Sequence, residues 1–307
     1  MKNKTLILLN FLILHSISAN SKTFLVFGGK TGWIGQQLVT LLEQQGHTPI
    51  CATSRLENRE HIIAEIESTK PDFIINTAGI TGRPNVDWCE DHKEETMRVN
   101  IIGTLNLIDI AHIKNIHITN ISTGCIYQYD ETHPLGSGIG FTEYDEPNFT
   151  GSFYSLTKVL LEKFVIQYPY VLHLRIRMPI SDDLNPRGFI GKLVQYPKLV
   201  NIPNTVSILH DLLPIIIEMT EKKITGIYNC VNPGTLSHNE IMELYKKYID
   251  PSHVYENFSL DDQAKILKAG RSNCQLDASK LLQYFPYIPH AKQSIIQVFE
   301  RMQQHIK

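Results

Sequence analysis

The sequence lacks the marks of several protein classes. Its five cysteines, Cys51, Cys89, Cys125, Cys230 and Cys274, include no Cys-x-x-Cys pair. We therefore expect neither a disulfide framework nor a metal site, and reduced thiols in the cytosol fit better. The 29 Lys and Arg residues nearly balance the 31 Asp and Glu residues, which gives no support for nucleic-acid binding or an anionic membrane partner. No internal repeat typical of solenoids or propellers is visible.

What is present is typical of a globular α/β protein. The 307 residues, 42% of them hydrophobic, suffice for a main domain with a smaller lobe. The first half alternates short apolar runs with helical patterns, as in a parallel sheet built from βαβ units. The expected strands are residues 23–27, 49–52, 72–76, 117–121 and 171–177. The expected helices are residues 33–45, 94–111 and 154–166.

The second half is less regular. Beyond Pro179 turns and short helices dominate, and one helix begins at a capping box formed by Ser237 and Glu240. We predict a Rossmann-type doubly wound parallel sheet over residues 22–179 and a smaller, mainly substrate-binding lobe over residues 180–307, which partly returns to the first domain. The helix at 94–111 is expected to share one face among Met97, Ile101, Leu105 and Ile108.

A glycine-rich turn follows the first expected strand. The string is Gly29-Lys30-Thr31-Gly32-Trp33-Ile34-Gly35, and its strand–turn–helix context predicts a dinucleotide whose pyrophosphate lies at the helix N-terminus. The second strand ends without the acid that would hold the ribose 2′-hydroxyl of NAD. Arg55 stands near that end instead and, with Lys30, suits a 2′-phosphate. We predict NADPH; NADH is the alternative, with both cations merely solvated.

A hydroxyl, a phenol and an ammonium follow in the order that carbonyl reduction requires. Thr123 ends an expected strand, and Tyr154 and Lys158 are four residues apart on an expected helix, so they share a face. Tyr154 would protonate a carbonyl oxygen, its pKa lowered by the Lys158 ammonium. Thr123 would donate a second hydrogen bond to that oxygen. A surface Tyr–Lys pair is the alternative.

Cys125 adds chemistry that a plain reductase does not need. On an extended segment, its side chain and that of Thr123 point the same way. A thiol with a pKa of about 8.5 suits general base catalysis, and a ketone acidifies the hydrogens on the two neighbouring carbons. Lys192, at the start of a helix, is a candidate for the acid on the opposite face. On the residues alone, a buried apolar Cys125 is as admissible as a catalytic one, and a solvated Lys192 is favoured over a catalytic one.

Several long strings make the chain similar to a known family. It resembles the extended short-chain dehydrogenase/reductases and, within them, the bifunctional UDP-4-keto-6-deoxyglucose 3,5-epimerase/4-reductases of UDP-rhamnose synthesis, including the C-terminal half of plant rhamnose synthases. The likeness runs from about Lys22 to Phe285. The strings are Gly32-Trp33-Ile34-Gly35, Ala78-Gly79-Ile80-Thr81-Gly82-Arg83-Pro84-Asn85, Thr123-Gly124-Cys125-Ile126, Gly151-Ser152-Phe153-Tyr154-Ser155, Arg177-Met178-Pro179-Ile180-Ser181 and Arg271-Ser272-Asn273.

The resemblance assigns roles to these residues. It implies that Thr123, Tyr154 and Lys158 form the reductase triad and that Cys125 and Lys192 form the epimerisation pair. Ala78 and Asn100 are placed on the cofactor side, Asn100 as a support of the active-site helix. Arg83, Asn85 and Arg271 are placed as substrate contacts, with Arg271 suited to the UDP phosphates. Gly191 stands where relatives carry a bulkier residue, so we expect a looser loop before Lys192.

The main hypothesis is an NADPH-dependent enzyme that converts UDP-4-keto-6-deoxyglucose, supplied by a separate 4,6-dehydratase, to UDP-L-rhamnose. One alternative is a 4-keto-reductase, with or without epimerase activity, acting on a TDP- or GDP-linked sugar. A dehydratase is disfavoured because Gly124-Cys125 replaces the Asp-Glu pair that follows the Thr in such relatives. A non-catalytic Rossmann sensor is disfavoured because Thr123, Tyr154 and Lys158 are all present. A homodimer is left open.

The N-terminal extension, residues 1–21, allows two interpretations. Lys2 and Lys4 precede the apolar run Thr5–Leu14, an order typical of a secretory signal. The run is too short to span a bilayer comfortably. An enzyme that uses a cytosolic cofactor pool would gain nothing from export, so we favour a cytoplasmic protein over an exported one.

Overall fold

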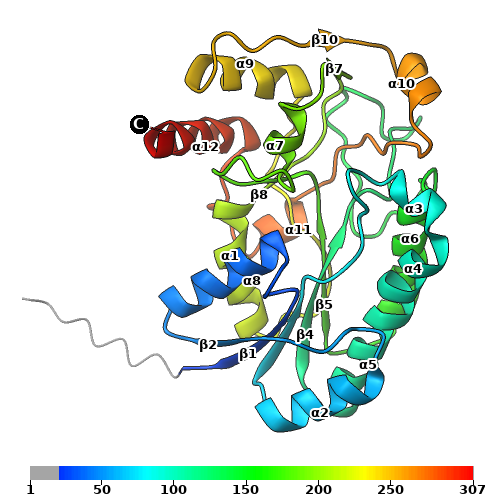
Figure 1. The fold of residues 1–307 in the computed structure, drawn as a ribbon, viewed down its shortest axis with the longest axis vertical. Helices are drawn as coiled ribbons and strands as arrows, with labels where there is room; N and C mark the ends of the chain where they lie inside the picture. Colours follow the sequence, from blue (N-terminus) through cyan, green and yellow to red (C-terminus); the bar gives the residue numbers. More distant parts are fainter. Residues whose placement is uncertain (1–20, 307) are drawn as a thin grey trace, which may run out of the picture.

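The computed structural model describes residues 21–306, so the predicted extension lies almost wholly outside the described residues. Six parallel strands form the central sheet in the order β2-β1-β3-β4-β5-β9, the doubly wound arrangement expected (Figure 1). Its strands are β1 (Thr23–Phe27), β2 (Thr48–Cys51), β3 (Phe73–Asn76), β4 (His117–Thr123), β5 (Val171–Ile176) and β9 (Gly226–Asn229). No helix within the described part is long and apolar enough to cross a membrane.

Helices cover both faces of this sheet (Figure 1). One face packs against α1 (Trp33–Gln44), α8 (Leu209–Glu221) and α11 (Ser279–Leu282). The other packs against α2 (Arg59–Thr69), α4 (Lys93–Met97), η1 (Arg98–Gly103), α5 (Thr104–Ile113) and α6 (Phe153–Val165), with α3 (Trp88–Asp91) beside α6. Because α8 and β9 return to the sheet after residue 179, the first layer contains chain from both halves.

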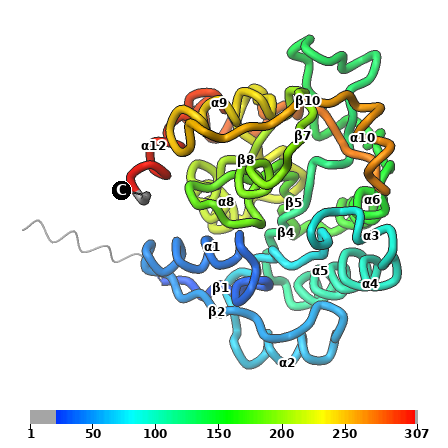
Figure 2. The backbone as a smooth tube through the Cα atoms, turned by 45° about the horizontal axis from the view of Figure 1, so that its top comes forward, coloured from blue at the N-terminus to red at the C-terminus, as the bar shows by residue number. Residues whose placement is uncertain are grey.

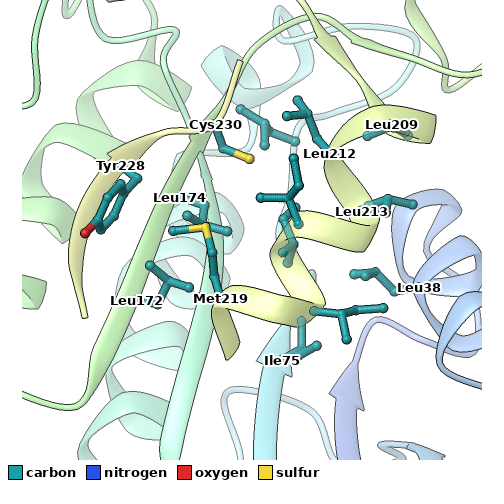
Figure 3. Close-up of a cluster of buried hydrophobic side chains, with 14 of the residues drawn as sticks. Leu38, Ile75, Leu172, Leu174, Leu209, Leu212, Leu213, Met219, Tyr228 and Cys230 are labelled. Carbon is teal, nitrogen blue, oxygen red and sulfur yellow. The ribbon is translucent and has the colours of Figure 1, made fainter. Parts of the chain in front are cut away.

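An apolar core fixes the sheet against α1 and α8. Figure 3 shows Leu38, Leu172, Leu174 and Leu212 meeting in this layer. Each is fully buried, and burying one such side chain contributes about 1.5–3 kcal/mol. The dense packing holds the carboxyl ends of the strands, from which the candidate site is built.

The remaining elements form a smaller layer beyond the carboxyl edge of the sheet. Here α9 (His238–Tyr248) and α12 (Ala291–Ile306) pack side by side (Figure 2), with α7 (Phe189–Leu193) against α9. Ser237 and Glu240 form the predicted capping box. The short elements are β6 (Pro179–Ile180), β7 (Lys198–Leu199), β8 (Ser207–Ile208), β10 (Glu256–Asn257) and α10 (Leu260–Ile266).

The helix expected at 94–111 is present, but its predicted face is wrong at the start. Ile108 is buried as expected, whereas Met97 is 39% exposed and Val99, Gly103 and Leu107 are buried as well. The cause is the π-helical segment η1, whose wider turn contains an extra residue and rotates the following face away from a regular helical period.

Candidate active site

The glycine turn forms a backbone cradle between β1 and α1. Gly28 has a positive φ of 80°, and the Gly32 N–H donates to its carbonyl oxygen at 2.9 Å. A Cβ at Gly32 would lie 2.6 Å from that oxygen, and one at Gly35 would overlap it. Helix α1 begins at Trp33 with no acidic residue in its first turn. The open N-terminus and the close backbone approach fit a bound pyrophosphate.

One group that contacts the chain just after β2 was not predicted from the sequence. Glu65 of α2 accepts hydrogen bonds from the backbone N–H groups of Thr53, at 2.7 Å, and Ser54, at 3.0 Å. Burial acts to raise the pKa of Glu65, but these hydrogen bonds lower it overall. Arg55 beside them is 76% exposed, with its guanidinium 3.3 Å from Glu57. Lys30 is exposed as well, so both predicted phosphate-binding cations face solvent.

The smaller layer beyond the carboxyl edge of the sheet closes over the glycine turn. Trp33 Nε1 donates to Asp183 at 2.9 Å, and Arg187 donates to the Thr31 carbonyl oxygen. A Cβ at Gly188 would lie 3.0 Å from the Trp33 ring. These contacts join the segment before α7 to the cofactor cradle. Sequence reasoning missed them because the partners are about 150 positions apart.

The predicted reductase triad lies at the carboxyl end of β4 and on the first turns of α6. Thr123, Tyr154 and Lys158 are all buried, and Ser152 caps α6 by accepting from the Ser155 N–H at 3.0 Å. Burial raises the pKa of Tyr154, and a hydrogen bond from Thr123 opposes that rise. Burial lowers the pKa of Lys158 to about 8.

The structure corrects the expected acidification of Tyr154. The Lys158 ammonium lies 5.7 Å from the Tyr154 ring centroid, and the dominant effect on the phenol is loss of water, which disfavours the charged phenolate. Tyr154 is therefore held in its protonated form, the form that a proton donor requires.

Asn100 fastens the wall of this site. Its Oδ1 accepts from the Ile80 N–H at 2.8 Å, and its Nδ2 donates to the Ile80 carbonyl at 2.9 Å and to Thr157 of α6 at 3.4 Å. Ala78 donates its N–H to Asn76 at 3.0 Å. The strand-end segment containing Ala78 is thereby held against α6, and η1 supplies the amide that joins them.

Cys125 lies in a turn, so the expectation of an extended segment is wrong. Because β4 ends at Thr123, the backbone folds back and the Cys125 N–H donates to Thr123 Oγ1 at 3.0 Å. That bond leaves the Thr123 hydroxyl proton available for another acceptor. Ser155 donates to the Cys125 carbonyl at 2.6 Å. The sulfur is half-buried and accepts from Arg177 Nη1 at 3.2 Å, a contact that sequence reasoning missed.

Lys192 lies on α7 within electrostatic range of Cys125. Burial lowers the pKa of Lys192, and the charge of Cys125 acts in the opposite direction. Gly191 is buried, and a Cβ there would overlap the backbone oxygen of Asn185. The expected looseness before Lys192 is therefore wrong, because the missing side chain allows close backbone packing.

The residues predicted to contact substrate form a second cluster. Arg271 Nη2 donates to Asn85 Oδ1 at 3.3 Å, and Arg271 Nη1 pairs with Asp87 at 2.9 Å. Asn85 also accepts from the Asp87 N–H at 2.9 Å. Arg83 is exposed and is not brought into these contacts. Asp87, which neutralises Arg271, was not predicted as a member of this cluster.

The fold and the site define the class. Residues 25–175 match the sequence profile of the NAD dependent epimerase/dehydratase family. A bifunctional dTDP-4-dehydrorhamnose 3,5-epimerase/dTDP-4-dehydrorhamnose reductase of Arabidopsis thaliana is 55% identical over 92% of this chain and 94% of its own length. The chain therefore belongs to this family and, within it, to the group of bifunctional epimerase/reductases.

Two further likenesses support this placement. A trifunctional UDP-glucose 4,6-dehydratase/UDP-4-keto-6-deoxy-D-glucose 3,5-epimerase/UDP-4-keto-L-rhamnose-reductase of Arabidopsis thaliana is 52% identical over 91% of this chain, which spans only 42% of that protein. The crystal structure of a UDP-rhamnose synthase from Acanthamoeba polyphaga mimivirus superposes with a TM-score of 0.87 at 38% identity, covering 92% of this chain and 99% of that one.

Proposed function

We propose that the protein is a bifunctional 3,5-epimerase and NADPH-dependent 4-keto-reductase that converts UDP-4-keto-6-deoxy-D-glucose to UDP-L-rhamnose. The observation that carries the proposal is the grouping of a thiol, a hydroxyl and a phenol around the end of β4. The Cys125 N–H donates to the Thr123 hydroxyl oxygen, and both Thr123 and Cys125 lie close enough to Tyr154 to influence its pKa. The relatives at 55% and 52% identity have names that describe this pair of activities.

The epimerase step needs a base and an acid. The ketone at carbon 4 acidifies the hydrogens on the neighbouring carbons. Cys125 Sγ takes one such proton, and the carbon–hydrogen electron pair becomes the enolate. The Lys192 ammonium then donates a proton to the same carbon from the opposite ring face, which inverts it. The lowered pKa of Lys192 supports this role because it makes the ammonium a stronger acid.

The reductase step uses the buried triad. NADPH, when bound along the glycine cradle, supplies a hydride to the carbonyl carbon. Tyr154 donates its phenolic proton to the carbonyl oxygen, and the Thr123 hydroxyl donates a hydrogen bond to the same oxygen. Lys158 lies beside Gly79, within 3.5 Å of where a Cβ on that residue would stand, in a position to hold the nicotinamide ribose. Arg55 and Lys30 are proposed to bind the 2′-phosphate.

Further parts of the proposal concern the surroundings of the reaction. Arg271 would bind the UDP phosphates, supported by Asn85 and Asp87, and Arg83 would contact the substrate from the exposed segment. The trifunctional relative has a name that includes a dehydratase activity, which supports a 4,6-dehydratase as the source of substrate. Unpaired cysteines support a cytoplasmic location. We also propose a boundary near residue 179 between the cofactor-binding and the substrate-binding parts of the chain.

The experiment that tests the function separates the two steps by variant. Cys125→Ala is expected to lose solvent deuterium uptake at the two carbons beside the ketone while it still reduces an already epimerised substrate. Tyr154→Phe is expected to retain deuterium uptake and to lose reduction by roughly 100-fold or more. NMR of the sugar and NADPH absorbance report the two steps. Deuterium uptake at the wild-type rate in Cys125→Ala would remove Cys125 as the base.

A homodimer is also proposed. Exposed apolar side chains lie on η1 and α5, at Ile102 and Ile113, and on the neighbouring α6, at Leu160 and Phe164. A second copy would bury such a face. Light scattering should give the mass of two chains for the wild type and of one chain for Phe164→Asp. A monomeric wild type would contradict this part.

A further inference from the structure

Arg177 is a buried cation whose charge is not neutralised by a carboxylate. It follows β5 and is fully buried, with 0% of its surface exposed. Among residues 21–306, no acidic side chain lies within ion-pair distance of it. Its guanidinium donates instead to neutral groups: Ser272 Oγ at 3.0 Å, the Ser272 carbonyl at 2.8 Å and the amide oxygen of Asn204. An uncompensated buried charge costs several kcal/mol, so its presence calls for an anion nearby.

Among residues 21–306, the remaining hydrogen-bond partner of the Arg177 guanidinium is the sulfur of Cys125. Arg177 Nη1 lies 3.2 Å from Cys125 Sγ, while Arg177 itself cannot reach a substrate because it is fully buried. Arginine keeps its proton throughout the working pH range, so it cannot serve as the acid. What it can supply is a fixed positive charge on the inner side of the thiol.

We propose that Arg177 is a positioning residue for the epimerase step, whose guanidinium holds the Cys125 sulfur as the anion that accepts the sugar proton. The inference rests on the role of Cys125 in the proposed function. An adjacent cation favours a thiolate over a thiol, and the hydrogen bond directs the sulfur. The neutral oxygens around Arg177 leave its charge available for this purpose.

The other ionisable groups near the pair titrate elsewhere. Burial raises the pKa of Cys274 to about 11 and that of Tyr129 to about 12, and burial lowers the pKa of His238 to about 4. Tyr154 also has a raised pKa. Lys192, whose pKa is lowered by burial, faces Cys125 from α7, but it gives no thiolate signal. A difference in thiol reactivity between the wild type and Cys125→Ala therefore reports Cys125.

The test measures ionisation of this thiol without substrate. Iodoacetamide alkylation and the ultraviolet absorbance of thiolate are followed against pH for the wild type, with Cys125→Ala subtracted as background. The guanidinium should favour the reactive anion of the Cys125 sulfur, so the Arg177→Met midpoint is expected at least one pH unit above that of the wild type, which slows alkylation at neutral pH about tenfold or more. Arg177→Lys, which keeps the charge, should restore part of the shift.

Ser272→Ala is the matched control, because it removes one partner of the guanidinium and leaves the sulfur contact in place. It should keep the wild-type midpoint. Arg177→Met should also lose deuterium uptake at neutral pH, recover it as pH rises, and retain reduction. Alkylation of wild-type Cys125 at neutral pH that is no faster than alkylation of free cysteine overturns the proposal even if Arg177→Met does not fold. An unchanged midpoint in folded Arg177→Met overturns it as well. Because no sugar is present, the result is independent of the proposed activity.

Discussion

Arg175 and Arg177 are both fully buried and lie two positions apart, yet their surroundings differ. Arg175 makes a two-point ion pair with Glu162 of α6, at 2.6 Å and 2.9 Å, and stacks 5.2 Å from the Tyr127 ring. Within residues 21–306, the Arg177 guanidinium donates to neutral oxygens and to the sulfur of Cys125. One charge is neutralised within the fold and holds α6 against β5. The other remains available to an anion formed at the site.

The largest expected effect on stability comes from removing the Glu162–Arg175 ion pair. Glu162→Gln leaves Arg175 buried without its counter-charge, which should lower the free energy of unfolding by about 3–5 kcal/mol. Urea denaturation measures it. The matched control is Glu218→Gln, which removes the exposed pair with Lys222 and should cost less than about 1 kcal/mol. Equal losses of unfolding free energy in the two variants would contradict the expectation that the buried Glu162–Arg175 pair contributes more to stability than an exposed pair.

Acid should break the same pair without mutation. Burial acts to raise the pKa of Glu162, but the nearby His173 ring and the hydrogen bonds from Arg175 lower it to about 2, against about 4.3 in the unfolded chain. A depressed folded pKa means that this stability is present above about pH 4.3 and is lost as pH falls towards 2, by about 3 kcal/mol in total. Urea midpoints between pH 5 and 2 should fall more steeply in the wild type than in Glu162→Gln. Parallel curves would contradict the assignment.

Arg177→Met should have the smaller effect on stability and the larger effect on chemistry. No carboxylate is left unpaired, so the loss is that of hydrogen bonds to Ser272 and Asn204, about 1–3 kcal/mol. Its deuterium uptake should fall, while uptake by Glu162→Gln should match the wild type. Urea denaturation and NMR exchange measure the two properties. The distinction between the two arginines fails if Arg177→Met is the less stable variant and still exchanges protons normally.

The sequence predicted those features that depend on local spacing. The strand–turn–helix pattern around Gly29 to Gly35, the four-residue separation of Tyr154 and Lys158, and the capping box at Ser237 all depend on neighbours within a few positions. Such patterns are readable because each repeats the geometry of a regular element. The parallel sheet followed from the alternation of these elements.

Features that depend on irregular backbone or distant neighbours were not predicted. The start of the predicted face of the helix at 94–111 was wrong because η1 changes the helical period at Arg98–Gly103. The turn at Cys125 was missed because a strand pattern does not indicate where the chain reverses. The role proposed for Arg177 was invisible because its contacts, Cys125, Asn204 and Ser272, are between 27 and 95 positions away. Lys192 was a candidate from its place at the start of a helix, but only the family resemblance favoured it over a solvated lysine.

The most direct test of the account is one incubation of the wild-type protein with UDP-4-keto-6-deoxyglucose and NADPH in deuterated water. The thiol and the phenol should act on the same bound sugar, so NMR should show UDP-L-rhamnose with deuterium at carbons 3 and 5 and one NADPH consumed per sugar. A reduced 6-deoxy sugar that keeps its original configuration and protium at both carbons would contradict the account.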